Sequence, residues 1–166
     1  MQNYFKIIPL FLSFLLIISC RNEKPPNNLI EKRNGLIYKQ KSDTPYTGTI
    51  KDTVKERIME YHVKAGLKDG QFKVSRLNGR VEMVGNMSND KNEGEWNYYY
   101  PNGQLESKGN YINDTASGKW IFYYKTGIKK EEGKYKDGKR EGKWVEYDST
   151  GHAIKYKNFT KGLETK

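Results

Sequence analysis

The 166-residue chain has one cysteine, Cys20, and two histidines, His62 and His152. A single thiol excludes an internal disulfide framework and a multi-thiolate metal site, and two separate histidines are too few for a histidine-rich one. Apolar residues are also scarce, at 35% of the chain against 30% charged. Thirteen of the first nineteen residues are hydrophobic, so the remainder holds too little apolar material for a large two-layer core.

The chain also lacks the short motifs of common enzyme classes. It contains no Gly-x-Ser-x-Gly, no phosphate-binding loop and no His-Glu-x-x-His. Glu131 and Glu132 are adjacent carboxylates, but they lie among lysines, a pattern typical of a solvated charged face. We therefore expect no enzyme activity, no metal and no cofactor.

The one long apolar run, residues 7–18, follows a segment with a single positive charge, as in a secretory signal, and is shorter than the about 20 residues that span a bilayer. It ends in Ile17-Ile18-Ser19-Cys20, which resembles the cleavage box of bacterial lipoproteins. The resemblance implies a signal peptide at residues 1–19, lipidation of Cys20 and anchoring in the bacterial cell envelope through acyl chains. The alternative is an uncleaved anchor followed by an ordinary buried cysteine.

The lipidated cysteine and a polar tether would occupy residues 20–34, where the Pro25-Pro26 pair and the polar composition leave little to bury. Nothing in these residues distinguishes the inner from the outer membrane.

Residues 35–163 carry an internal repeat of 24 residues, with units near 46–69, 70–93, 94–117, 118–141 and 142–165, and a tail at 164–166. The first unit is imperfect. Each of the other four has two glycines nine residues apart, a large aromatic residue two positions after the first glycine and, in three of them, a third glycine. The glycines are Gly70, Gly79, Gly85, Gly94, Gly103, Gly109, Gly118, Gly127, Gly133, Gly142 and Gly151, and the aromatic residues are Phe72, Trp96, Trp120 and Trp144.

Each unit reads as a β-hairpin. The expected turns are Asn78-Gly79, Asn102-Gly103, Thr126-Gly127 and Thr150-Gly151, with positive φ at both turn residues. A second set of turn formers, such as Asn113-Asp114, reverses the chain into the next unit. The prediction is an all-β, elongated, single-sheet antiparallel β-meander built from 24-residue hairpin repeats. Polar residues in the last unit, and residues 36–38 with the first hairpin, would cap its ends.

A two-residue turn at Asn102-Gly103 sets a register in which paired residue numbers sum to 205. It places Trp96 opposite Gly109, Tyr98 opposite Ser107 and Tyr100 opposite Leu105, all on one face. The indole would then cover the bare backbone of its cross-strand glycine. A three-residue turn would instead place Lys108 opposite Trp96.

Units of the form Gly-x-Trp-x-x-Tyr-Tyr-x-x-Gly, followed by Gly-x-Tyr-x-x-Gly, resemble MORN repeats of the bacterial MORN-repeat-variant type. The whole arrangement, with the entry at Pro45-Tyr46-Thr47-Gly48, is similar to the YwqK-type antitoxin-like family. The resemblance implies a module for membrane binding, protein binding or assembly. A secretion signal is not expected in an antitoxin, because an exported protein would not meet a toxin that acts in the cytoplasm.

The aromatic residues of the repeats are the candidate binding face, and they permit two interpretations. They would form either a ligand platform or the core of a sheet that has no second layer. Tyr99, Tyr123 and Tyr147 lie on the opposite, more polar face and are the preferred contact stripe, unless they form only a cross-strand ladder that fixes register. The other candidates are Trp96, Tyr98, Tyr100, Trp120, Tyr124 and Trp144.

The net charge of +10 is concentrated towards the C-terminus, where residues 118–166 have 13 Lys and Arg against 7 Asp and Glu. Such a surface would attract a protein, anionic lipid or glycan partner, although the lysines would equally serve solubility. Nucleic acid fits less well, because lysines alternate with glutamates. We expect a membrane-anchored envelope lipoprotein whose repeats form a non-catalytic binding or scaffold module. The alternative is an antitoxin or immunity-type protein that neutralises one toxin.

Overall fold

A computed structural model describes residues 30–165, and all of the secondary structure in this range is β-strand. The strands are β1 (Ile30–Arg33), β2 (Leu36–Lys39), β3 (Gly48–Val54), β4 (Arg57–Lys64), β5 (Leu67–Arg76), β6 (Val81–Ser88), β7 (Lys91–Tyr99), β8 (Leu105–Ile112), β9 (Thr115–Tyr123), β10 (Lys129–Lys136), β11 (Lys139–Tyr147), β12 (Ala153–Thr160) and β13 (Leu163–Thr165). Within residues 30–165 no helix is long and apolar enough to cross a membrane.

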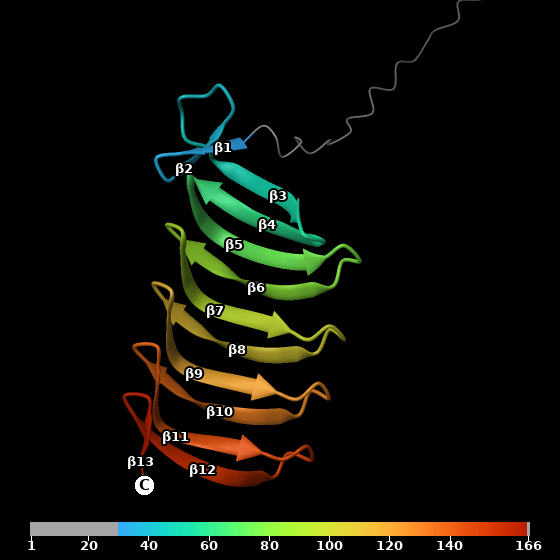
Figure 1. Cartoon of the computed structure of the whole chain (residues 1–166), viewed down its shortest axis with the longest axis vertical. Helices are drawn as coiled ribbons and strands as arrows, with labels where there is room; N and C mark the ends of the chain where they lie inside the picture. Colours follow the sequence, from blue (N-terminus) through green and yellow to red (C-terminus); the bar gives the residue numbers. More distant parts are fainter. Residues whose placement is uncertain (1–29, 166) are drawn as a thin grey trace, which may run out of the picture.

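Strands β3 to β13 form one antiparallel sheet of eleven strands in chain order, and β1 and β2 form a separate pair (Figure 1). Each strand therefore pairs only with its neighbours in the sequence, and the chain descends as a meander. Strands β7, β9 and β11 begin at intervals of 24 residues, as do β6, β8, β10 and β12. The predicted all-β single-sheet meander is confirmed.

The hairpin turns differ from the prediction in length. The Tyr100 carbonyl accepts a hydrogen bond from the Gly103 N–H (2.8 Å), and the Tyr100 N–H donates to the Gln104 carbonyl (2.8 Å). Gly103 has φ 89°, whereas Asn102 is not in the positive-φ region. The loop is thus a three-residue turn with a left-handed glycine at its third position, rather than a two-residue turn.

A compensating bulge follows each of these loops. Tyr99, not Tyr100, pairs with Leu105, and the register then shifts so that Tyr98 pairs with Ser107 and Trp96 with Gly109. The predicted partner of Trp96 is therefore correct, whereas the predicted pairing of Tyr100 with Leu105 at the hairpin tip is wrong. The extra residue in the loop is offset by one extra residue in the strand that follows it. The two-residue turns with positive φ at both positions lie at the opposite ends of the strands, where one hairpin is joined to the next, as at Asn113 (φ 49°) and Asp114 (φ 66°).

The tryptophans cover a different glycine from the expected one. A Cβ on Gly109 would lie 2.1 Å from Cδ2 of Trp120, which belongs to the next strand, although the backbone partner of Gly109 in β7 is Trp96. Opposite Gly109, strand β9 carries a bulge that includes Gly118 (φ 68°), and this bulge directs the indole back over β8. The same arrangement places Trp96 on Gly85 and Trp144 on Gly133.

The indoles and their neighbours form a continuous aromatic row along one face of the sheet. Ring centroids are 5.2 to 6.4 Å apart from Tyr61 in β4 to Phe159 in β12. Trp96, Trp120 and Trp144 are 3%, 5% and 0% exposed. A single-layer sheet thus buries its tryptophans by laying each indole flat on a glycine and surrounding it with other rings.

The N-terminal end of the sheet is covered, whereas β13 and most of β12 at the other end are exposed. Ile37 of β2 packs with Ile50 and Val63, and its N–H donates to the Gly66 carbonyl (2.9 Å), which confirms the predicted cap at residues 36–38. At the other end, the Arg140 guanidinium lies 4.0 Å from the centroid of the Trp144 ring and 5.3 Å from that of Phe159.

Two segment boundaries differ from those predicted. Residues 30–33, assigned to the tether, form β1, because Asn34 (φ 50°) and Gly35 (φ 84°) make a tight turn that pairs them with β2. Residues 163–165 form β13, which pairs with the end of β12. The expected signal peptide and Cys20 lie outside the described residues.

Candidate functional site

The two faces of the sheet have different roles, and the tryptophans belong to the packed one. The Nε1 groups of Trp96, Trp120 and Trp144 donate to the carbonyls of residues 86, 110 and 134 at 3.0 to 3.2 Å. Because each indole is buried and its one polar atom is satisfied, a ligand at this face would not contact the indoles directly.

Three of the candidate tyrosines also connect neighbouring strands or repeats. Tyr98 stacks between Trp96 and Trp120, and its hydroxyl lies 3.2 Å from that of Tyr111. Burial first, and then this hydrogen bond, raises the pKa of Tyr98.

Tyr100 and Tyr124 donate their hydroxyl protons to the carbonyls of Tyr123 and Tyr147, both at 2.7 Å. Each of these bonds joins one hairpin to the next, so both tyrosines contribute to packing between repeats.

Tyr99, Tyr123 and Tyr147 lie on the opposite face, at the ends of β7, β9 and β11, and we call them the tyrosine stripe. Every second strand contributes one ring, which spaces the rings by about 9 to 10 Å. None of the ring-to-ring contacts among the described residues involves a stripe tyrosine, whereas the aromatic row is continuous. The rings therefore do not form the stacked ladder considered above, and each is half-buried beside polar neighbours.

The C-terminal end of the stripe contains an ionic network around Glu132. The Tyr147 hydroxyl donates to Glu132 Oε1 (2.6 Å), and the Nζ atoms of Lys119 and Lys129 lie 2.9 and 3.0 Å from the two carboxylate oxygens. Burial alone would raise the pKa of Glu132, but Lys119, Tyr147 and Lys129 together lower it to about 2. The hydrogen bond to Glu132 raises the pKa of Tyr147 to about 12. This end of the stripe is internally neutralised.

At the N-terminal end of the stripe, beside Tyr99, lies a groove of about 490 Å³. Its polar lining comes from Gln71 and Lys73 of β5 and from Arg80, and its apolar lining from Val81 and Val84 of β6. Neither Lys73 nor Arg80 forms an ion pair with any residue in the described range, and no carboxylate lines the groove. We call this site the Tyr99 groove.

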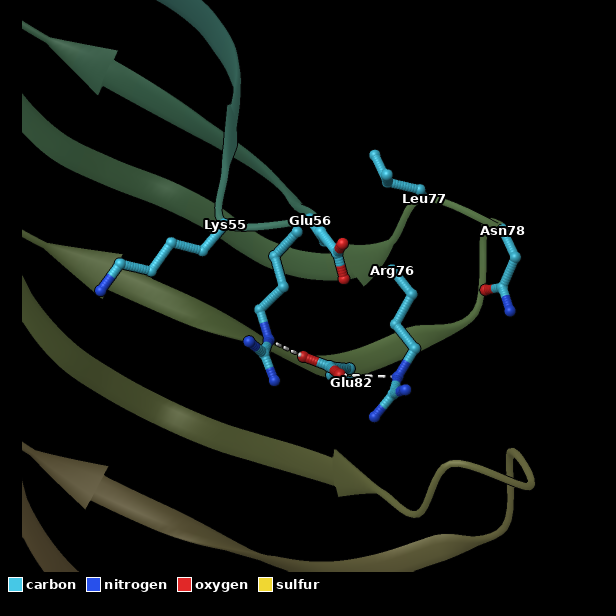
Figure 2. Close-up of a pocket in the computed structure, with 7 residues that line it drawn as sticks. Lys55, Glu56, Arg76, Leu77, Asn78 and Glu82 are labelled. Carbon is cyan, nitrogen blue, oxygen red and sulfur yellow. Dashed lines mark hydrogen bonds and ion pairs between the residues drawn. The ribbon is translucent and has the colours of Figure 1, made fainter.

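A second charged cluster lies near the tips of the hairpins β3–β4 and β5–β6 (Figure 2). Glu82 accepts from Nε of Arg57 (2.5 Å) and is paired with Nε of Arg76 (2.8 Å), as the dashed lines in Figure 2 mark. The hydrogen bond from Arg57 lowers the pKa of Glu82. Since one carboxylate satisfies two guanidinium groups on β4 and β5, this cluster acts as an ionic connection between three strands.

Within the described range no group of three or more metal-ligating side chains comes together. His62 and His152 remain apart: His62 faces Thr49 in the β3–β4 register, and His152 Nδ1 contacts the Thr150 hydroxyl (2.7 Å).

Comparison with known proteins gives one positive result. The model of the MORN repeat variant family matches residues 92–113 and 116–137, which cover β7–β8 and β9–β10. A search of curated proteins gave no match. The two matched segments are 24 residues apart, in agreement with the structural period. The chain thus contains MORN-type repeats, which indicate a repeat-based binding or scaffold module.

The sequence alone predicted neither the Tyr99 groove nor the cluster of Arg57, Arg76 and Glu82. Lys73 and Arg80 look like ordinary surface cations in the sequence, because only the structure shows that neither forms an ion pair within the described residues and that no carboxylate lines the groove. The one available signal in the sequence was the position within the repeat, because the next unit has the uncharged residues Asn97 and Gln104 at the places of Lys73 and Arg80.

Proposed function

We propose that this chain is a lipid-anchored protein of the bacterial cell envelope, and that its repeat array is a non-catalytic binding or scaffold module. Its partner would be a protein or an anionic envelope component, bound on the face that carries the tyrosine stripe. The proposed anchor is Cys20, supported by the apolar run that ends in Ile17-Ile18-Ser19-Cys20.

The observation that carries the binding role is the contrast between the two faces. The aromatic row is a packed core in which the tryptophans are at most 5% exposed. The tyrosine stripe makes no ring contact with that row or within itself in the described part of the chain, yet it places three amphipathic rings in a line beside lysines. Rings that stand outside the aromatic core and are aligned on a surface are typical of a contact site.

Anchoring is tested by changing Cys20 to Ala. The unlipidated precursor should leave the membrane fraction on alkaline washing, whereas the wild-type protein should stay. A Cys20→Ala protein that remains in the washed membranes would contradict the anchor.

The binding role is tested by cross-linking capture of the anchored protein from its native envelope, compared with a Tyr99→Leu/Tyr123→Leu variant. A partner lost in the variant but retained by a Tyr156→Leu control, in the last repeat, would support the proposal. Capture of one toxin, whose activity the protein abolishes, would instead establish the antitoxin role. Equal capture by both variants would overturn the assignment of the stripe.

A further inference from the structure

We propose that the Tyr99 groove is a subsite for an acidic sugar residue, such as a uronic acid, within an anionic glycan that lies along the tyrosine stripe. The inference rests on the proposed function, because it names the ligand class of that same face. Three independent properties of the groove lead to it: charge, lining chemistry and position along the repeats.

The charge of the groove is positive and uncompensated. Lys73 faces Glu60 across the β4–β5 register, but the Glu60 carboxylate is paired with Lys51 at 3.6 Å. Arg80 donates from Nη1 to the carbonyl of Pro101 (2.9 Å), which holds the guanidinium between two hairpins and leaves its other N–H groups available. Two cations without an ion pair, one of them fixed in place, favour an anionic ligand group.

The remaining lining suits a sugar ring. Tyr99 offers an aromatic ring, Val81 and Val84 offer apolar contacts, and the Gln71 amide can both donate and accept hydrogen bonds. A sugar has an apolar ring face and several hydroxyl groups, so it uses all of these partners at once.

The position along the repeat makes the site specific to one end of the stripe. One unit further on, Gln71 and Lys73 are replaced by Glu95 and Asn97, and Glu95 Oε1 accepts from the Asn97 amide (3.2 Å). Around Tyr147 the lysines are neutralised by Glu132. A glycan that crosses the strands would therefore have its acidic group recognised at Tyr99, would pass Lys108 of β8, and would meet neutralised lysines around Tyr147.

The test is binding of the full-length protein, purified in detergent, to polygalacturonate, a linear uronic acid polymer. Amylose is the uncharged comparison, and polyglutamate and phosphatidylglycerol vesicles are the acidic peptide and lipid comparisons. The variant is Lys73→Gln/Arg80→Gln, and its control with the same charge change is Lys91→Gln/Lys136→Gln, at exposed positions away from the groove. Folding of each variant is checked from its melting curve.

We expect polygalacturonate to bind more tightly than the other three probes, and the groove variant to lose about tenfold or more in affinity while the control changes little. Equal effects of the two double variants would mean non-specific charge attraction and would overturn the subsite. Tighter binding of polyglutamate or of the vesicles would overturn the sugar assignment. If polygalacturonate does not bind but the envelope capture still depends on the stripe, only the subsite fails; if neither occurs, the proposed function fails as well.

Discussion

At the scale of single residues, the fold depends on three glycine–tryptophan pairs. Gly85, Gly109 and Gly133 are the positions where a side chain would enter an indole ring of the following strand. The tryptophan supplies apolar area that a one-layer sheet otherwise lacks, and the glycine supplies the space for it. Neither residue can change alone without disturbing the other.

We predict that Gly109→Ala destabilises the protein more than Gly118→Ala. The first substitution places a Cβ 2.1 Å from Trp120. The Cβ of the second meets no atom within 4 Å, so the only cost is that of an alanine held in a left-handed conformation, with φ at 68°. Strain in a packed core costs about 1 to 3 kcal/mol or more, against about 1 to 2 kcal/mol for the left-handed conformation. Urea unfolding of the two variants compares them, and equal losses would argue against the packing of the indole on the glycine.

The Glu132 network predicts a pH dependence of stability. The folded-state pKa of Glu132 is about 2, below the ordinary value of 4.5. The stabilising contribution is therefore present above about pH 4.5 and is lost as the pH falls towards 2, because protonation then favours the unfolded chain. The free energy of unfolding should decline by about 2 kcal/mol more between pH 5 and pH 2 in the wild type than in Glu132→Gln. Parallel curves for the two proteins would contradict the network.

Tyr147 extends this argument to alkaline pH. Its pKa is raised from 10.0 to about 12, so the neutral phenol is favoured in the folded state. Its contribution is present below about pH 10 and is lost as the pH rises through 12.

At the scale of elements, the sequence predicted the strands and their order but not how each hairpin tip is built. The glycine period and the aromatic positions identify the repeats, because the 24-residue spacing is the same whatever the length of the turn within each hairpin. The loop length was wrong because Asn102-Gly103 fits both a two-residue turn and the last two positions of a three-residue turn. The bulge after the loop restores the register, so Trp96 still pairs with Gly109.

We predict that damage to one end of the array stays local. Ile37→Ala removes part of the cluster with Ile50 and Val63, at a cost of about 2 to 4 kcal/mol. Because each repeat contacts only its neighbours, amide hydrogen exchange should rise in β3 and β4 and remain unchanged in β9 to β12. A uniform rise over all strands would contradict the repeat-by-repeat description of stability.

At the scale of the whole molecule, one sheet face provides the core, and we propose that the other face is used for recognition. The sequence located the tyrosine stripe, because alternation along a strand separates Tyr99 from Tyr98. It could not locate the Tyr99 groove, since Lys73 and Arg80 become unusual only because neither forms an ion pair within the described residues and no carboxylate lines the groove. Nor could it show that the tryptophans are fully packed, which depends on the bulges that turn each indole onto the previous strand.

The most direct test of this account is site-specific photo-cross-linking in the native envelope, with benzoylphenylalanine placed at one position on each face. Tyr123 represents the stripe, and Met83, which pairs with Val74, represents the face of the aromatic row. The account predicts cross-links to a partner from position 123 and none from position 83. Cross-links from position 83 alone would contradict the central claim that the tyrosine face binds while the tryptophan face is the core.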